Sequence, residues 1–210
     1  MSFTVATRVG KSGARTVVRF EGVLVGDGAD RERDDDLALA KRAADGDAAA
    51  FADLMGRHRS RLYAVCRRIT CHDEDAHEAL QNTMITVWSK LRDFQGTSAV
   101  GTWLYRVATN AAIDEVRRRG RAPQPVETLP EARPRDGADH AAIARVDVDR
   151  ALARIPPQFR VVVVLYEIAG LSYAQIAELR DLPIDTVKSQ LSRGRKALVA
   201  LLTEAGAHAA

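Results

Sequence analysis

Arginine and asparagine residues recur at helical spacing in the segment Thr102–Arg121, TWLYRVATNAAIDEVRRRGR. At about 100° per residue, a helical wheel groups Arg106, Asn110 and Arg117 on one side, with Asp114 beside them. Arginine can present two donors to a guanine edge, asparagine can pair with an adenine edge, and clustered arginines neutralise phosphates. This side therefore suits DNA, although a solvated helix end whose arginines complement the helix dipole has the same composition.

The opposite side of this segment is apolar and is expected to face a core; it holds Leu104, Val107, Ala108 and Ala111. The preceding stretch FQGTSAVGTW, residues 94–103, places two glycines and several small residues between Phe94 and Trp103. Aromatic rings stack on unpaired bases, so this loop is suited to receive a base from an opened duplex. A plain helix–helix connection with two core aromatics is the alternative.

The stretch LSYAQIAELRDLPIDTVKSQLSRGRKAL, Leu171–Leu198, predicts a helix–turn–helix. Ser172 and Gln175 have the spacing of a capping box. Asp181 tolerates a turn, and Pro183 suits the first turn of the following helix.

The second helix of this pair divides into an apolar and a basic side. Val187, Leu191, Gly194 and Leu198 fall on one face, and the opposite face holds Asp185, Lys188, Ser189, Ser192, Arg193 and Lys196. The run from Lys188 to Lys196 carries four basic residues and no acid. This division is expected of a recognition helix in the major groove; an ordinary helical hairpin with a basic solvent face is the alternative.

Helical patterns must position both sites, and the first set of them covers residues 34–121. Asp36 is the expected N-cap of the first helix, the run DGD at residues 45–47 interrupts the pattern, and a further helix is expected over Asp73–Leu91. Residues 1–33 are expected to form a disordered tail. The stretch TVVRFEGVLV permits a short strand, but no partner strand is evident nearby.

Four of the seven prolines, Pro123, Pro125, Pro130 and Pro134, lie within residues 122–141. Proline removes a backbone donor, so we interpret this segment as a flexible linker. Residues 142–204 return to a helical pattern, and residues 205–210 are expected to form a short tail. The run RVVVV from Arg160 favours a strand by propensity, but an isolated strand cannot satisfy its backbone, so a buried helix ending near Gly170 is expected.

The sequence thus predicts an all-α protein of two small helical domains joined by a linker. The chain has 210 residues, 46% of them hydrophobic, and a net charge of +3, which is too small to prove a nucleic-acid partner by itself. Two cysteines do not form a disulfide framework, and no apolar run approaches the length of a membrane span. We expect a cytoplasmic protein.

The sequence resembles the extracytoplasmic-function (ECF) sigma factors of the sigma-70 family in two separate motif sets. The helix–turn–helix stretch at residues 171–198 is similar to their region 4. DAHEALQNTMITVWSKL followed by FQGTSAVGTWLYRVATNAAIDEVRRRGR is similar to their region 2. The likeness covers about residues 35–121 and 143–203, in the family's order. It implies a sigma factor, without enzymatic activity of its own, that binds core RNA polymerase and directs promoter-specific transcription initiation.

The resemblance also implies which residues contact promoter DNA. Positions matching contacts to the −10 element are Phe94, Thr97, Ser98, Trp103, Arg106, Asn110, Asp114, Arg117 and Arg118. Positions matching contacts to the −35 element are Lys188, Ser189, Ser192, Arg193 and Lys196. Asp181, Gln190 and Gly194 depart from residues frequent in the family, which affects the expected promoter preference more than the class.

The partners implied by the resemblance are core RNA polymerase, promoter DNA and an anti-sigma factor that holds the protein inactive until a stress response. Glu78, Gln81, Asn82 and Trp88 match positions that dock on the β′ clamp helices, and region 4 is expected to contact the β flap. Asn82 departs from the acidic residue common at its position. No cofactor and no direct membrane insertion are expected.

Two other classes of protein remain open. One is a freestanding helix–turn–helix regulator that binds palindromic DNA as a dimer, although no dimerisation or ligand domain accompanies the motif. The other is an enzyme or adaptor, but no Gly-rich phosphate loop, HExxH or nucleophile elbow supports it. The spacing of Cys66, Cys71, His72 and His77 matches no familiar zinc arrangement, so no metal site is expected.

Overall fold

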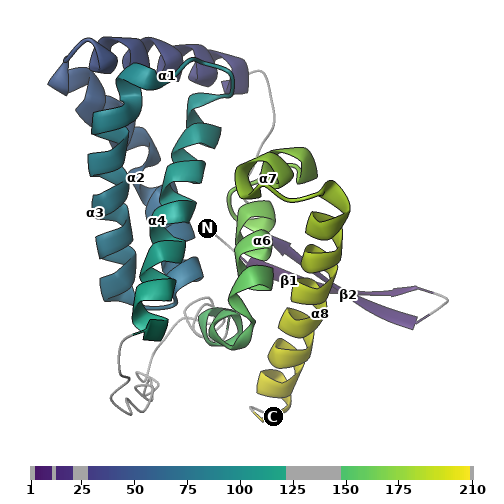
Figure 1. Cartoon of the computed structure of the whole chain (residues 1–210). Coiled ribbons are helices and arrows are strands. Elements are labelled where there is room, and N and C mark those ends of the chain that lie inside the picture. Colours follow the sequence, from purple (N-terminus) through teal and green to yellow (C-terminus); the bar gives the residue numbers. More distant parts are fainter. Residues whose placement is uncertain (1–2, 11–12, 21–27, 122–147, 209–210) are drawn as a thin grey trace, which may run out of the picture. The chain divides into compact units, whose positions relative to one another are not determined.

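The computed structural model describes residues 3–10, 13–20, 28–121 and 148–208, with side chains over 33–121 and 148–204. The helices before residue 122 form one compact unit, and the main body of the helices after residue 147 belongs to another (Figure 1). Residues 28–121 and 148–208 are helical apart from the turns that join their helices, as predicted. The predicted linker at residues 122–141 lies outside the described residues.

The first unit consists of four helices. They are α1 (Gly28–Ala44), α2 (Ala48–Thr70), α3 (Asp73–Lys90) and α4 (Val100–Arg121), with a 3-10 turn, η1 (Leu91–Asp93), after α3. In Figure 1, α2, α3 and α4 run alongside one another, and α1 crosses one end of them. Their shared core is aliphatic and includes Leu54, Leu62, Ile69, Val87 and Leu104, each at most 1% exposed.

Helix α1 begins earlier than predicted, so Asp36 is not its N-cap. Asp36 lies inside the helix and turns its carboxylate inward, where Oδ2 is 2.6 Å from Nε2 of His58 on α2. Both side chains are buried. The expectation of a cap rested on residue type alone, and the tertiary contact with α2 explains the acid better.

The predicted interruption at residues 45–47 is confirmed. Gly46 adopts a φ of 99°, a conformation that favours glycine, and Asp47 caps α2 by accepting a hydrogen bond from the backbone N–H of Ala50 at 3.0 Å. This bond, followed by the side chain of Arg42, lowers the pKa of the Asp47 carboxyl. The turn therefore sets the direction in which α2 leaves α1.

Residues 3–20 differ from the predicted tail. Strand β1 (Phe3–Gly10) pairs antiparallel with β2 (Gly13–Phe20), so that Phe3 lies opposite Phe20 and Gly10 opposite Gly13. The partner strand that the sequence pattern lacked is supplied by the adjoining stretch of the same segment. The hairpin precedes the two helical units and does not change their class.

The second unit contains a helix over residues 148–154, then α6 (Pro157–Glu167), α7 (Tyr173–Arg180) and α8 (Ile184–His208). The valine run is helical, as predicted, because Val161–Leu165 is buried throughout and α6 packs against α8. Arg160 is also buried and donates from Nη1 to the carbonyls of Leu152 and Ala153, at 3.2 and 3.3 Å. It thereby satisfies the end of the preceding helix.

The helix–turn–helix is formed by α7 and α8. The backbone N–H of Ser172 donates to Gln175 Oε1 at 2.9 Å, and that of Gln175 donates to Ser172 Oγ at 3.3 Å, so the predicted capping box is present. Asp181 has a φ of 51° in the turn. On α8 the predicted apolar face is buried at Val187, Leu191, Gly194 and Leu198.

Candidate nucleic-acid interface

Helix α4 presents the predicted polar stripe to solvent. Asn110, Asp114 and Arg117 are exposed, and Arg106 is half-buried. Arg117 Nη1 lies 3.6 Å from Asp114 Oδ1, one turn back on the same side. An exposed pair of this kind contributes little to stability, so it leaves the guanidinium able to exchange its partner for a phosphate or base.

The inward side of α4 differs in part from the prediction. Leu104 and Ala108 are buried as expected, but Val107 and Ala111 are only partly buried. The buried side continues instead through Ala112 to Glu115. The core-facing stripe is therefore rotated toward a buried carboxylate that the apolar pattern did not reveal.

The loop before α4 brings its two aromatic rings together. Phe94 and Trp103 lie with ring centroids 5.2 Å apart at an interplanar angle of 42°. Both side chains are partly exposed, Thr97 is exposed and Ser98 is half-buried. Gly96 has a φ of 70°, which allows the sharp turn between them. Two partly exposed rings beside small polar residues can stack on a base.

Arg118 is directed differently from Arg117. Its Nε donates to Glu115 Oε2 at 2.7 Å, and Asn82 Nδ2 on α3 donates to Glu115 Oε1 at 3.4 Å. The hydrogen bond to Glu115, then its charge, and further the charges of Asp75 and Glu78 on α3, raise the pKa of Arg118. Two residues expected at different sites, Asn82 and Arg118, thus meet at one buried carboxylate.

The outer face of α3 combines polar and apolar side chains. Glu78 and Gln81 are exposed, Trp88 is 46% exposed, and Phe51 of α2 lies edge-on against it with centroids 4.9 Å apart. Ile85 lies between Gln81 and Trp88 in the sequence of α3 and is 67% exposed. Neither Ile85 nor Phe51 was among the residues predicted to bind a partner. An isoleucine on the polar side of the α3 wheel was the signal that could have indicated this surface.

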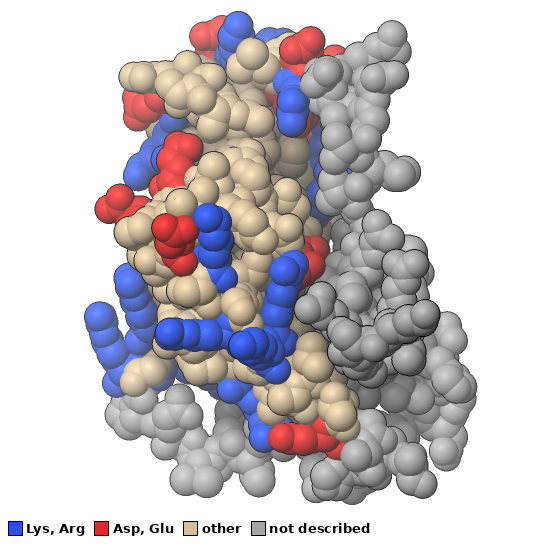
Figure 2. Space-filling model, turned by 90° about the vertical axis from the view of Figure 1, so that its right-hand side faces the viewer, with Lys and Arg blue, Asp and Glu red and all other residues tan. Residues whose placement is uncertain are grey.

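The polar face of α8 carries the predicted basic residues. Lys188, Ser189, Ser192, Arg193 and Lys196 are all exposed. Lys188 Nζ lies 3.0 Å from Asp185 Oδ1, one turn before it. Figure 2 presents the face of the molecule on which α8 lies, and Lys and Arg side chains gather in its lower half. Such a face is suited to phosphates and base edges.

One further arginine of α8 serves the helix–turn–helix itself. Arg195 donates from Nε to Glu167 Oε1 at 2.6 Å, and its guanidinium lies 4.8 Å from the ring centroid of Tyr166. Tyr166 in turn stacks on Tyr173 of α7, with centroids 5.0 Å apart. These contacts join α6, α7 and α8. From the sequence, Arg195 was only one of the four basic residues between Lys188 and Lys196, and this structural role was not predicted.

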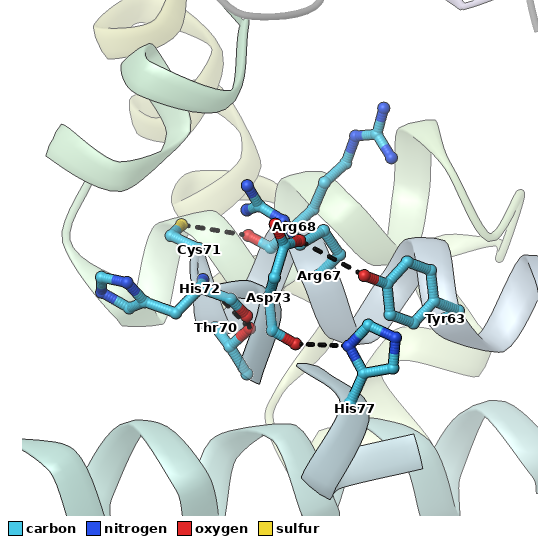
Figure 3. Close-up of polar contacts among 8 residues, drawn as sticks. All are labelled: Tyr63, Arg67, Arg68, Thr70, Cys71, His72, Asp73 and His77. Atoms are coloured by element: carbon cyan, nitrogen blue, oxygen red, sulfur yellow. Dashed lines mark hydrogen bonds and ion pairs between the residues drawn. The ribbon is translucent and has the colours of Figure 1, made fainter. Parts of the chain in front are cut away.

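The cysteine and histidine residues near the α2–α3 junction do not converge. In Figure 3, Cys71, His72 and His77 point in different directions, and Nδ1 of His77 lies 2.8 Å from the carbonyl oxygen of Asp73. Cys71 Sγ faces the carbonyl of Arg68 at 3.5 Å. Over the described part of the chain, no three His, Cys, Asp or Glu residues are grouped to hold a metal ion.

Cys66 is a core residue. It is fully buried on α2, and burial raises the pKa of its thiol to about 12.

As for membranes, none of the helices in the described ranges has the length and hydropathy needed to cross one.

Family models match both helical units. Residues 54–122 match sigma-70 region 2, and residues 145–198 match sigma-70 region 4. The first range contains the α4 stripe and the loop before it, and the second contains the helix–turn–helix. The order and spacing of the two matches are those that the sequence resemblance predicted.

Curated relatives and solved structures agree with these matches. The chain is 36% identical to ECF RNA polymerase sigma factor SigM of Mycobacterium tuberculosis over 179 residues, which cover 85% of this chain and 89% of SigM. It is 35% identical to SigE of Mycolicibacterium smegmatis, covering 79% and 67% of the two chains.

Among solved structures, CnrH in complex with the cytosolic domain of CnrY is 26% identical, with a TM-score of 0.63 over 81% of this chain and 98% of CnrH. RpoE of Bartonella quintana in complex with the anti-sigma factor NepR has the same fold, with a TM-score of 0.59 at 24% identity, over 72% and 98% of the two chains. With two family models matched in order and relatives above 30% identity over most of its length, the chain belongs to the ECF sigma factors of the sigma-70 family.

Proposed function

We propose that this chain binds core RNA polymerase and directs it to promoters by recognising a −10 element with its first helical unit and a −35 element with its second. The observation that carries the proposal is the presence of region 2 and region 4 matches, in that order, on one chain. Each unit also exposes a polar helix face suited to DNA. A freestanding helix–turn–helix regulator has no use for the first unit.

The −10 element is read by the loop before α4 and by the stripe on α4. Phe94 and Trp103 stack on a base that leaves the duplex, with Thr97 and Ser98 available to hydrogen-bond its edge. Arg106, Asn110, Asp114 and Arg117 follow the strand along α4. Opening DNA forfeits base stacking, and the cost falls when an extruded base finds a shaped pocket.

The −35 element is read in the major groove by the exposed face of α8: Lys188, Ser189, Ser192, Arg193 and Lys196. The capping box and the contacts of Arg195 support this role because they hold α8 against α7 and α6. Specificity requires that the base-reading side chains be placed accurately in the groove.

Core polymerase binds the outer face of α3 through Glu78, Gln81, Asn82 and Trp88, joined by Ile85. Two large exposed apolar residues beside polar ones, here Ile85 and Trp88, are typical of a protein-binding surface. The β′ clamp helices are the expected partner of this face, and the β flap that of the second unit. The chain acts in the cytoplasm and performs no catalysis of its own.

An anti-sigma factor holds the protein inactive until a signal releases it. The support is that CnrH and RpoE, two structures of the same fold, were solved in complex with CnrY and with the anti-sigma factor NepR. Masking either DNA-reading face or the α3 face would be sufficient for inhibition.

Transcription from purified components tests the function. The 5′ ends of transcripts induced by overexpression identify candidate promoters, and core polymerase plus this chain should then initiate at the same positions without any other factor. Absence of a stable complex and of accurately positioned RNA, with no inhibitor present, contradicts the proposal. Binding to a palindromic duplex without polymerase would favour a freestanding regulator instead.

The −35 assignment has a matched control within the same unit. K188A and R193A should each weaken promoter binding by the holoenzyme and lower its salt dependence by about one unit of slope, because each removes a phosphate contact. R154A removes another exposed basic residue, 65% accessible, that pairs with Glu204 and lies outside the recognition face. It should leave the slope unchanged.

A further inference from the structure

Glu115 is a buried carboxylate on α4 with one partner on each of two helices. Its side chain is 8% exposed. Oε1 accepts a hydrogen bond from Asn82 Nδ2 of α3 at 3.4 Å, and Oε2 accepts one from Arg118 Nε at 2.7 Å. Burying a carboxylate is unfavourable unless it is hydrogen-bonded, and each oxygen of Glu115 has such a partner.

Arg118 is held at the α3 side of α4 but stays accessible. Its side chain is 67% exposed, although its Nε is bonded to Glu115. The charges of Asp75 and Glu78 on α3 also act on the guanidinium. Glu78 belongs to the outer face of α3, so the positive charge of Arg118 adjoins that face.

Arg117, the preceding residue, belongs to the other side. Adjacent residues differ by about 100° around a helix. Arg117 pairs with Asp114, which is 72% exposed and lies on the stripe with Asn110. Two consecutive arginines of similar exposure are therefore directed to different surfaces, and the buried Glu115 distinguishes them.

We propose that Glu115 is a positioning residue that holds Arg118 beside α3, so that Arg118 serves the polymerase-binding face together with Asn82 and not the −10 DNA. The proposal rests on the proposed function, because it assigns Arg118 to one of the two partners named there. It replaces the expectation, based on resemblance, that Arg118 contacts the −10 element.

The test compares R118A with R117A in the full-length chain. Two quantities are measured: the affinity for core polymerase, and the salt dependence of promoter binding by the assembled holoenzyme. R118A should weaken the core complex about fivefold, the scale of one exposed charge contact, and leave the salt slope unchanged. R117A should lower the slope by about one and leave core affinity unchanged.

A mutant cycle tests whether Glu115 acts through Arg118. Gln at position 115 still accepts from Asn82 but has no charge to hold a guanidinium. E115Q should therefore reproduce the loss of core affinity seen with R118A, and the double variant E115Q/R118A should lose no more than R118A alone. A merely structural role of Glu115 would add its effect to that of R118A.

Each other pattern overturns the proposal. A lowered salt slope in R118A assigns that arginine to DNA, unchanged core affinity removes it from the α3 face, and additive losses in the cycle show that Glu115 acts independently. If E115Q does not fold, the comparison of R118A with R117A decides, because both arginines are exposed. Failure of the wild-type chain to bind core polymerase would instead refute the proposed function.

Discussion

At the scale of single residues, the buried pair of Asp36 and His58 attaches α1 to α2. Their side chains are 8% and 11% exposed, and Arg57 Nη1 also reaches Asp36 Oδ1 at 3.3 Å. His58 also lies near the start of α4, since a Cβ added at Gly101 would lie 3.6 Å from its Cε1. The carboxylate of Asp36 thus holds a histidine that lies near the start of α4.

Asp36→Ala should lower the free energy of unfolding by about 2 kcal/mol, because it leaves His58 buried without its partner. Urea unfolding followed by circular dichroism measures the loss. Asp35→Ala is the control, because Asp35 is the adjacent residue on α1 and its side chain is 67% exposed. Its change should stay within about 0.5 kcal/mol. Equal losses of unfolding free energy in the two variants would show that the buried pair of Asp36 and His58 makes no specific contribution to stability.

Cys66 predicts a chemical contrast with Cys71. The raised pKa of Cys66, about 12, leaves almost no thiolate at pH 8, and the side chain is fully buried. Iodoacetamide at pH 8 should label Cys71 in the folded protein and both cysteines in urea, as read by mass spectrometry. Labelling of Cys66 under native conditions at the same rate as Cys71 would contradict the burial.

The same shift has a consequence for stability in alkali. An unfolded thiol ionises near its ordinary pKa of 9.0, while the folded thiol keeps its proton until about 12. The unfolded state therefore binds fewer protons between these values, and the free energy of unfolding should fall as pH rises through that window. Cys66→Ala should remove this part of the pH dependence.

At the scale of helices, the close approach of α6 and α8 depends on Gly194. A Cβ at this position would lie 2.5 Å from Val163 Cγ2 and 3.2 Å from the carbonyl oxygen of Phe159. Gly194 is one of the positions at which this chain departs from residues frequent in the family it resembles. In this chain an added methyl group requires the Val163 side chain or the adjoining backbone of α6 to shift.

Gly194→Ala should therefore destabilise the protein by about 1–3 kcal/mol, because overpacking forces the helices apart. Gly56→Ala on α2 is the matched control, since nothing lies within 4 Å of its added Cβ. It should stabilise by about 0.5–1 kcal/mol through helix propensity. Thermal unfolding of both variants measures the difference. A Gly194→Ala variant more stable than the wild type would show that the added methyl group fits between α6 and α8.

The capping box before α7 makes a smaller prediction. Ser172→Ala removes the acceptor for the Gln175 backbone N–H and should cost about 1 kcal/mol. Because α7 supports α8, amide hydrogen exchange should increase in α7 before it increases in α6. Exchange that rises only in the first unit would contradict the assignment.

At the scale of the whole molecule, two DNA-reading faces on one chain predict avidity. Two linked contacts on one promoter make the second contact intramolecular. Holoenzyme binding to a fragment that retains either the −35 or the −10 element alone should be weaker by about a hundredfold or more than binding to both. Gel-shift titration measures the ratio, and scrambling the bases between the elements is the control. Equal affinities would show that one unit alone reads the promoter.

Local patterns predicted most of the helices because their causes are local. The end of α1 at Ala44, the span of α3 and the helix–turn–helix all follow from apolar spacing, glycine and capping residues. The hairpin at residues 3–20 was missed because pairing depends on register between two stretches, which alternation within one stretch does not specify.

The candidate site was predictable in type but not in its connections. Residue types placed Arg106, Asn110 and Arg117 on one exposed side, because a helix wheel needs only a constant angle per residue. No wheel of α4 alone indicates that Glu115 is buried against Asn82 of α3. The same limit applies to Arg195, whose partners lie on α6.

Spacing within single segments was sufficient to predict the two helical units and the sides of α4 and α8 that carry polar residues. It could not predict the pairing of Asp36 with His58, the close approach of α6 to Gly194 or the hydrogen bonds that Asn82 and Arg118 make to Glu115. Those facts depend on distances between helices, and such distances are set by how all the side chains of a core pack together.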